Sequence, residues 1–484
     1  MRNARLIIKD EVNLKIEGLE LDARRACMKK FEYEVPGARY MPSVKLGRWN
    51  GKVSYFSLAG STYINLLEDI IPILEELHYD IELEDLRDYS TTFAFNEVTT
   101  DTFAHVNWPK GHTHEGKPIQ LRDYQVEVIN EFLKNPQSIQ EVATGAGKTI
   151  MTAALSASVE QYGRSIVIVP NKSLVTQTEV DYKNLGLDVG VYFGDRKEYN
   201  KQHTICTWQS LNILLKNTKA GSADCTIQEF IEGVVCVMVD EVHMAKADAL
   251  KQLLTGVMSR VPIRWGLTGT IPKAEYERIA LLVSLGGVTN KLSASELQDK
   301  GVLANCHVNV VQLQDGQEFQ NYQAELKHLL TDENRLDKIC DLIDTIKDSG
   351  NTLVLVDRIN AGNEITKRIK DAVFISGSTK VNERKEEYDE VATVDGKVLV
   401  ATYGVASVGI NIPRIFNLVL IEPGKSFVRV IQSIGRGIRK AEDKDFVQIW
   451  DITSSCRFAK RHLTQRKAFY REANYPFVIE KLNY

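Results

Sequence analysis

The sequence predicts an α/β protein with two parallel-sheet domains in tandem, preceded by a small α+β domain. Short β-branched apolar runs alternate with helix-prone segments from about residue 140 onward, which is typical of a parallel sheet. The alternation occurs twice, and only the first series contains a glycine-rich loop. The length of 484 residues suits about three domains that each bury their own core.

Composition is that of an ordinary globular protein, with 43% hydrophobic and 26% charged residues. No apolar run approaches the ~18 residues of a membrane span, and the N-terminus has no apolar leader, so we expect no membrane association. The seven cysteines include no C-x-x-C pair, which favours reduced thiols in a cytoplasm. A net charge of −4 means that any binding of nucleic acid depends on local basic patches.

Residues 1–100 are expected to form the small α+β domain, with a helix over Ile64–Leu77 and a strand over Ile81–Leu86. Its first 52 residues hold twelve Lys and Arg against seven Asp and Glu, clustered on a predicted helix, Leu21–Phe31, and in the turn-rich segment Pro42–Lys52. Cations beside a tryptophan suit a surface that contacts phosphates and stacks bases. A solvated helix face and a β-hairpin with a core tryptophan and an Asn50-Gly51 turn explain the pattern equally well. The candidates for substrate selection are Arg24, Arg25, Lys29, Lys30, Arg48, Trp49 and Lys52.

Residues 101–118 lack periodicity and contain two prolines and two glycines, which indicates a linker. His112 and His114 lie there without other ligands at metal-binding spacing, so a metal site is the minor alternative. The first parallel-sheet domain is expected over residues 119–294. Near its start, Arg122 and Gln125 precede a helix, and a glutamine here could recognise an adenine edge.

The stretch Glu141–Thr149, EVATGAGKT, predicts a phosphate-binding loop that opens a helix over Ile150–Gln161. Glycines let backbone N–H groups approach a polyphosphate, and the helix N-terminus favours its negative charge. Lys148 can then reach the β- and γ-phosphates, and the Thr149 hydroxyl can ligate Mg²⁺. The full G-x-x-x-x-G-K-[ST] pattern needs a glycine where the chain has Val142, and the alternative is a loop that only turns the chain. The loop candidates for nucleotide binding are Thr144, Gly145, Ala146, Gly147, Lys148 and Thr149.

Polar clusters follow the buried strands predicted at Ser165–Val169, Thr204–Thr207, Val234–Val239 and Ile263–Leu267. The carboxyl ends of strands are where open α/β sheets bind ligands. Asp240 and Glu241 emerge at such an end, where Asp240 would hold Mg²⁺ and Glu241 would polarise the water that attacks a γ-phosphate. An acidic helix cap is the alternative.

The second parallel-sheet domain is expected over residues 295–484, with strands at Thr352–Val356, Val373–Ile375, Val398–Ala401 and Leu418–Ile421. It has no phosphate loop, which suggests two sheets that share one nucleotide. Gln432, Arg436 and Arg439 recur on one face of a predicted helix, where a surface salt-bridge face is the alternative.

In order and spacing, TGAGKT, DEVH at 240–243, LTGT at 267–270, ATYGVASVGINIP at 401–413 and QSIGRGIRK at 432–440 resemble motifs I, II, III, V and VI of superfamily 2 helicases. The resemblance covers residues 121–440 and implies two RecA-like domains that use ATP and Mg²⁺. It implies that Gln432, Arg436 and Arg439 serve the γ-phosphate and that Gly409 forms a tight turn of the nucleotide site. Asn411 stands where the family commonly has Asp, which puts a ribose contact in doubt.

The same resemblance implies nucleic-acid contacts, made mainly through phosphates, at Pro170, Asn171, Lys172, Thr207, Trp208, Gln209, Arg358, Ser376, Gly377 and Thr402. The tail Arg457–Arg471 has six Lys and Arg, no acid and three aromatic residues. It could bind a nucleic-acid backbone, or it could be a packed helix with a solvated basic face.

GRWNGK near the N-terminus and the basic tail resemble phage helicases of recombination and repair. That resemblance implies an ATP-dependent helicase in the host cytoplasm that acts on Holliday junctions, D-loops, R-loops and stalled forks. Its expected partners are branched DNA, single-stranded DNA, RNA–DNA hybrids, and single-strand-binding and recombination proteins. Two rivals stay open: a double-strand DNA translocase subunit of a restriction or remodelling complex, and a nucleotide-gated nucleic-acid-binding module.

Overall fold

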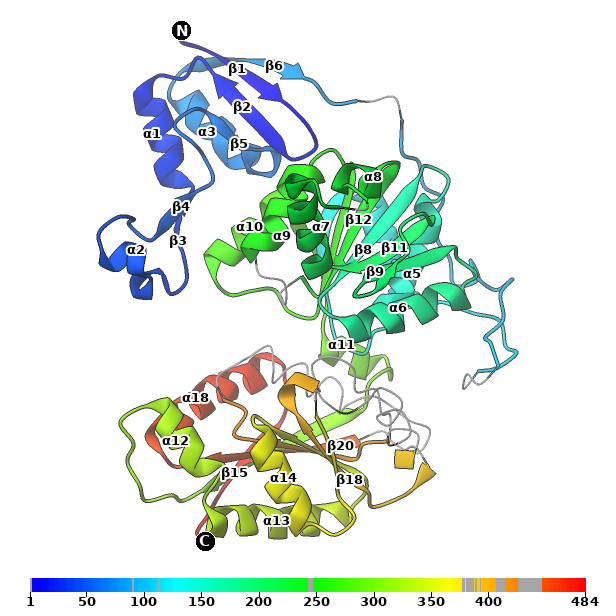
Figure 1. The fold of residues 1–484 in the computed structure, drawn as a ribbon, viewed down its shortest axis with the longest axis vertical. Coiled ribbons are helices and arrows are strands. Elements are labelled where there is room, and N and C mark those ends of the chain that lie inside the picture. Colours follow the sequence, from blue (N-terminus) through cyan, green and yellow to red (C-terminus); the bar gives the residue numbers. More distant parts are fainter. Residues whose placement is uncertain are drawn as a thin grey trace. The chain divides into compact units, whose positions relative to one another are not determined.

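The computed structural model describes residues 2–88, 91–110, 114–223, 225–242, 247–376, 379, 387, 390–391, 393–405, 414–424 and 446–484. Contacts divide the chain into two compact units (Figure 1). The first comprises Met1–Val142 and Gly147–Lys291, and the second comprises Ala143–Ala146 and Leu292–Tyr484. The predicted fold class, two parallel-sheet domains after a small α+β domain, is confirmed. The domain boundaries proposed from the sequence stay predictions.

The N-terminal domain is a four-stranded sheet in the order β5-β2-β1-β6. Its strands are β1 (Arg2–Ile8), β2 (Asn13–Glu17), β5 (Ser61–Tyr63) and β6 (Tyr79–Asp85), and its helices are α1 (Leu21–Lys30), the short η2 (Ile64–Leu66) and α3 (Leu67–Glu76). Alternate residues of β1 are buried, as in a sheet with one covered face. The helices predicted near Leu21 and Ile64 and the strand predicted near Ile81 are confirmed.

A lobe leaves this domain between β3 (Glu32–Glu34) and β4 (Lys52–Ser54), which pair antiparallel. The intervening residues 35–51 contain η1 (Ala38–Tyr40) and α2 (Pro42–Lys45). The alternative of a β-hairpin is confirmed in its antiparallel strand pair, but the turn does not lie at Asn50-Gly51 and Trp49 is only partly buried. Glu34 pairs with Lys52, so the turn that joins the two strands is the whole lobe.

The first parallel-sheet domain has the strand order β10-β9-β11-β8-β12-β13-β7-β14. The pairs between β9, β11, β8, β12, β13 and β7 are parallel. The strands are β7 (Gln137–Val142), β8 (Arg164–Val169), β9 (Val189–Phe193), β10 (Arg196–Lys197), β11 (His203–Thr207), β12 (Val234–Asp240), β13 (Ile263–Thr268) and β14 (Gly287–Leu292). The helices are α4 (Asp123–Lys134), α5 (Lys148–Val159), α6 (Lys172–Asn184), α7 (Trp208–Ala220), α8 (Ile227–Ile231), α9 (Ala247–Gln252), η4 (Leu253–Val257) and α10 (Glu275–Leu285). The four strands that the sequence predicts after the phosphate loop of this domain are confirmed as β8, β11, β12 and β13.

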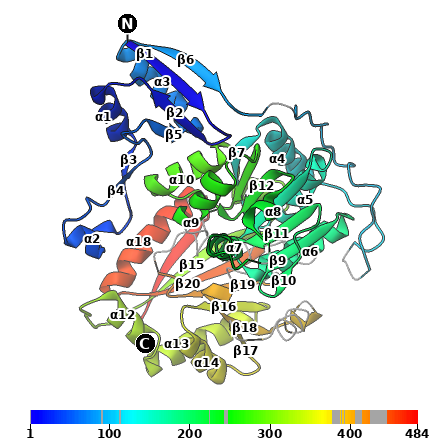
Figure 2. The same ribbon diagram turned by 45° about the horizontal axis from the view of Figure 1, so that its top comes forward.

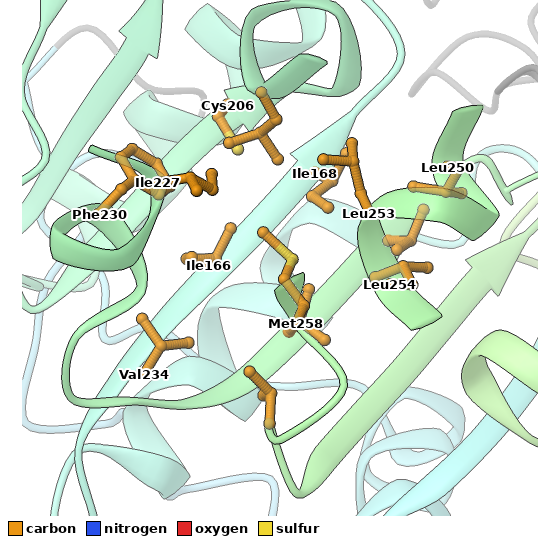
Figure 3. Packing of buried hydrophobic residues seen from close by; sticks show 14 of the residues in the cluster. Ile166, Ile168, Cys206, Ile227, Phe230, Val234, Leu250, Leu253, Leu254 and Met258 are labelled. Atoms are coloured by element: carbon orange, nitrogen blue, oxygen red, sulfur yellow. The ribbon is translucent and has the colours of Figure 1, made fainter. Parts of the chain in front are cut away.

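Apolar side chains from both strands and helices hold this sheet in place (Figure 3). Ile166 and Ile168 of β8 lie in one buried cluster with Phe230 of α8 and Leu253 of η4. This packing fixes the strands whose carboxyl ends carry the polar clusters.

The second parallel-sheet domain has the order β17-β18-β16-β19-β20-β15-β21, and its neighbouring strands run parallel (Figure 2). The strands are β15 (Asn305–Leu313), β16 (Thr352–Val356), β17 (Val373–Ile375), β18 (Val398–Thr402), β19 (Asn417–Ile421), β20 (Phe446–Ser454) and β21 (Phe477–Leu482). The helices include α11 (Ala294–Asp299), α12 (Tyr322–Leu329), α13 (Glu333–Lys347), α14 (Ile359–Arg368) and α18 (Arg457–Glu472). The four strands predicted in this half are confirmed. Among the residues described, no helix is both long and apolar enough to cross a membrane.

Candidate nucleotide and nucleic-acid sites

The glycine-rich loop joins β7 to α5, and its shape suits a phosphate. Gly145 and Gly147 have φ angles of +93° and +84°, which L side chains rarely adopt. A Cβ at Gly147 would lie 2.7 Å from Nε2 of Gln125, and at this φ any side chain would strain the backbone. Gly147 is the N-cap of α5 and no side chain caps this helix, which leaves first-turn N–H groups for a ligand. By contacts, Ala143–Ala146 group with the second unit, and the buried Thr144 hydroxyl has no hydrogen-bond partner within the described chain.

Lys148 and Glu241 form an ion pair, with 3.0 Å between Nζ and Oε1. Lys148 also donates to the Val142 carbonyl at 3.2 Å. The other oxygen of Glu241 accepts the Gly269 N–H at 3.4 Å, so this carboxylate joins the phosphate loop to the 267–270 turn. The side chains of the pair are only 8% and 13% exposed, which shields their attraction from solvent.

Asp240 ends β12 with a buried carboxyl group. Burial, together with the neighbouring charge of Glu241, raises the pKa of Asp240 to about 7, while Lys148 acts in the opposite direction. A divalent cation would relieve this cost, because it favours the ionised carboxylate. With the uncapped N-terminus of α5 and the Thr149 hydroxyl on that helix, Asp240 makes a donor set that fits a magnesium–nucleotide.

The Thr149 hydroxyl donates a hydrogen bond to the carboxylate of Asp181 on α6. Burial raises the pKa of Asp181. Sequence reasoning missed this residue, since Asp181 lies inside a helix and belongs to no motif. Only the packing of α6 against α5 brings it beside the phosphate loop. If Thr149 ligates Mg²⁺, it has to turn its hydroxyl oxygen toward the metal.

Arg122 and Gln125 lie at the start of α4. Oε1 of Gln125 accepts the backbone N–H of Arg122 at 2.9 Å, and the Arg122 guanidinium donates to the Tyr124 hydroxyl at 3.1 Å. The amide nitrogen of Gln125 borders Gly147, which places the predicted adenine reader against the phosphate loop. Recognition of adenine by Gln125 stays a prediction.

The predicted nucleic-acid contacts of the first unit follow β8 and β11. Asn171 and Thr207 cap α6 and α7, accepting backbone N–H groups from Leu174 and Ser210. Gln209 donates to the Pro170 carbonyl at 3.3 Å, so the two clusters come together. Lys172 is exposed, and Trp208 packs partly against the buried core.

In the second unit, three predicted contacts follow strands of the sheet. The Arg358 guanidinium donates to Gln323 at 2.8 Å, and the Thr402 hydroxyl accepts the Val405 N–H at 3.3 Å. The Ser376 N–H donates to the Thr379 hydroxyl at 3.0 Å. The remaining candidates of this half lie outside the described residues: Gly377, Gly409, Gln432, Arg436 and Arg439.

The cations of the N-terminal domain divide into two groups. Arg24 donates to the carbonyls of Leu19 and Leu58, and Lys52 pairs with Glu32 at 3.2 Å, so both have structural contacts. The other four predicted cations are exposed and form no ion pair with any described residue: Arg25, Lys29, Lys30 and Arg48. Trp49 is partly buried and donates its indole N–H to the Lys52 carbonyl at 2.8 Å.

The basic tail is the packed helix α18, the second of the two alternatives. Phe469 and Tyr470 are buried, so they offer no face to a base. Arg466 is buried as well and forms a two-bond pair with Asp451 at 2.8 and 2.9 Å. Its remaining cations include the exposed Lys460 and Arg461.

Two families match the chain: "Type III restriction enzyme, res subunit" over residues 118–273 and "Helicase conserved C-terminal domain" over residues 334–441. The ATP-dependent DNA helicase uvsW of Enterobacteria phage T4 is 24% identical over 466 residues, covering 91% of this chain and 88% of that protein. The putative DNA 3'-5' helicase Rad25 of Haloarcula marismortui is 26% identical over 346 residues, covering 68% of this chain and 52% of that protein. A fragment structure of a putative HsdR subunit of a type I restriction enzyme from Vibrio vulnificus YJ016 shares the fold. Its TM-score is 0.55 at 18% identity, covering 75% of this chain and 68% of that one.

Proposed function

The chain belongs to the superfamily 2 helicases, and we propose that its ATP-driven movement unwinds and branch-migrates branched nucleic acids. The proposed substrates are Holliday junctions, D-loops, R-loops and stalled forks in recombination, repair and replication. The observation that carries the proposal is the cluster of Lys148, Asp240 and Glu241 at the carboxyl edge of a parallel sheet, beside a phosphate loop. The choice of branched substrates is supported by the relation to T4 UvsW, which covers 91% of the chain.

In the proposed mechanism, Lys148 exchanges its ion pair with Glu241 for the β- and γ-phosphates of ATP. The carboxylate released in this way orients the attacking water and accepts its proton. Mg²⁺, when bound, would neutralise phosphate charge, and Thr149 and Asp240 are the residues that would hold it. Because Glu241 also contacts the Gly269 N–H, a change at the hydrolysis site would reach the 267–270 turn directly.

Several roles in this proposal rest on the motif resemblance alone. Gln432, Arg436 and Arg439 would act on the γ-phosphate. An arginine in that position raises the rate of nucleotide hydrolysis by ~10³–10⁵-fold. The two strand-end clusters of the first unit would hold the nucleic-acid backbone, with Lys172 as the exposed cation. DNA and RNA–DNA hybrids are both proposed substrates.

The test is strand displacement on forked DNA, a four-way junction and an RNA–DNA hybrid, each with ATP. The wild-type protein should separate strands in at least the junction and the fork. Lys148→Ala should lower ATP hydrolysis by at least about 10²-fold, because it removes the cation that binds the phosphates. Its affinity for DNA should stay near the wild-type value. Substantial remaining hydrolysis would contradict the assignment of the phosphate loop.

A second candidate function has a specific observation in its favour, because the family matched over residues 118–273 is a restriction-enzyme subunit. A double-strand translocase would displace a triplex-forming strand from duplex DNA without separating the duplex. The triplex assay beside strand displacement therefore distinguishes the two candidates. ATP hydrolysis that nucleic acid does not stimulate would favour a nucleotide-gated binding module instead.

A further inference from the structure

The lobe between β3 and β4, residues 35–51, combines exposed apolar side chains with exposed cations. Tyr40, Met41 and Leu46 are 65%, 40% and 64% exposed. Arg39, Lys45 and Arg48 are exposed too, and residues 35–51 contain no Asp or Glu. The lobe extends away from the four-stranded sheet of its domain (Figure 1).

The exposure of these side chains does not come from a loose loop. The Val35 N–H donates to the Gly51 carbonyl at 2.9 Å and closes the base of the lobe. Gly51 has a φ of +79°, and a Cβ there would lie 3.1 Å from the Cβ of the buried Ala38. The buried Ala38 thus packs against Gly51 inside the lobe. An ordered lobe that keeps large apolar residues outside is a mark of a binding surface.

An arginine and an aromatic side chain of the lobe already interact with each other. The Arg39 guanidinium lies over the Tyr40 ring, 4.8 Å from its centroid. Trp49, the aromatic residue that the sequence singles out, is instead partly buried with its indole N–H in use. Tyr40 is therefore the aromatic residue of this lobe that can offer a free ring face.

The combination of cations and apolar faces fits one feature of branched DNA. A linear duplex presents phosphates on its outside and hides the faces of its base pairs in the stack. At a branch point, the last base pair of an arm can be unstacked, and aromatic or aliphatic side chains can then pack on it. The cations would contact the flanking phosphates. An apolar protein partner would leave three cations unneutralised, so charge complementarity favours DNA.

We propose that Tyr40 and Leu46 pack on the exposed base pair at the branch point of a DNA junction, while Arg39, Lys45 and Arg48 hold the adjacent phosphates. The proposal rests on the proposed function, because it identifies the element that distinguishes a junction from linear duplex. It assigns the base contact to Tyr40 and Leu46 instead of Trp49, whose indole N–H is bonded within the lobe.

The test measures the affinity of the full-length protein for a four-way junction and for linear duplex of the same sequence, at several salt concentrations. Tyr40→Ala/Leu46→Ala should lower the ratio of junction to duplex affinity by at least about fivefold, because base stacking is lost. For this variant, the slope of the logarithm of the DNA-binding constant K against the logarithm of the salt concentration should equal that of the wild type, because no charge is removed. The matched control is Leu83→Ala in β6, since Leu83 is also 64% exposed but lies outside the lobe. The conservative variant Tyr40→Phe/Leu46→Met should keep the wild-type ratio.

An unchanged ratio in Tyr40→Ala/Leu46→Ala, with normal melting behaviour, would overturn the inference. The inference would also be overturned if Leu83→Ala lowered the ratio of junction to duplex affinity as much as Tyr40→Ala/Leu46→Ala does. A wild-type protein that hydrolyses ATP in response to single strands and displaces strands, yet binds junction and duplex equally, would overturn this inference and leave the helicase function intact. A wild-type protein without nucleic-acid-stimulated ATP hydrolysis would instead contradict the proposed function.

Discussion

At the scale of single residues, Glu241 holds an unusual backbone conformation beside the phosphate loop. Its φ of +52° is rare for a residue with a side chain and costs about 1–3 kcal/mol. Such a conformation persists where the surroundings fix it, and here the carboxylate contacts both Lys148 and the Gly269 N–H. The conformation places two adjacent carboxyl groups, those of Asp240 and Glu241, in different environments: one is buried and the other is paired with a cation.

Glu241→Gln should trap ATP. The amide keeps the size of the side chain and can still accept the Gly269 N–H, but it loses the charge that orients the attacking water. We expect ATP affinity close to the wild-type value and a turnover lower by roughly 10²–10⁴-fold. Equilibrium nucleotide binding and steady-state hydrolysis measure the two quantities separately. A collapse of ATP affinity would mean that Glu241 is a main metal ligand or a structural residue.

Buried charges in the second unit form a cluster with a surplus carboxyl group. Arg335 contacts Glu422 at 2.6 Å and Asp315 at 3.3 Å, and Arg466 contacts Asp451. Three carboxyl groups thus share two guanidinium groups, and one bound proton would make the cluster neutral. Burial raises the pKa of Glu422 to about 7, although Arg335 and Arg466 act to lower it.

The raised pKa of Glu422 predicts a pH dependence of stability. The folded domain keeps a proton that the unfolded chain releases above its reference pKa of 4.5, so stability falls as pH rises from about 4.5 to about 7. The full effect is about 3 kcal/mol. Glu422→Gln cannot ionise, so its free energy of unfolding should fall less between pH 5 and pH 8 than that of the wild type. Urea unfolding followed by tryptophan fluorescence at both pH values measures this difference. Equal falls in the two proteins would show that Glu422 is ionised throughout.

At the scale of elements, α18 attaches to its sheet through a buried cation. The Arg466 guanidinium pairs with Asp451 of β20 and donates to the Gly424 carbonyl at 2.8 Å, while the Tyr470 hydroxyl donates to the same aspartate at 2.8 Å. A helix whose sequence reads as a basic tail is therefore part of the fold. Its capacity to bind nucleic acid is limited to the cations on its exposed face.

Arg466→Ala should destabilise the second parallel-sheet domain by about 3–5 kcal/mol, because it leaves the Asp451 carboxylate buried without its cation. Lys460→Ala, which removes an exposed cation from the same helix, should change stability by no more than about 0.5 kcal/mol. Urea unfolding of both variants makes the comparison. Similar small effects would mean that the pair contributes little to the attachment of α18.

At the scale of the whole molecule, the N-terminal domain is built into the first unit. Tyr276, Ala280 and Val283 of α10 belong to the same buried cluster as the core of that domain. After β6, Phe93 and Phe95 pack against Tyr162. Deleting residues 1–100 would expose these apolar surfaces, so the role of the domain is better tested by substituting its surface charges.

Neutralising four exposed cations should weaken binding to DNA and flatten its salt dependence. The variant replaces Arg25, Lys29, Lys30 and Arg48 by glutamine. Each lost phosphate contact removes about 0.9 from the slope of log K against log salt, so the slope should fall by up to about 3–4. Lys9→Gln, an exposed cation of the same domain outside this group, should leave the slope unchanged. If the fourfold variant kept the wild-type slope, its cations would be a solvated face only.

The sequence by itself determined the features that depend on local pattern. Apolar runs located the strands of both parallel sheets, because a buried strand needs consecutive apolar residues. The glycines and Lys148 of the phosphate loop are adjacent in the chain, so their spacing already indicates their chemistry. Because parallel strands end at one edge of a sheet, the strand pattern also predicted that Asp240 and Glu241 lie near that loop.

Tertiary structure alone decided which polar groups have partners. The contact between Thr149 and Asp181 joins two helices, and that between Arg466 and Asp451 joins a helix to a strand. Pattern and spacing cannot predict such pairs, because they depend on how the elements pack. Packing likewise gives Trp49 a structural hydrogen bond and leaves Tyr40 of the same lobe exposed.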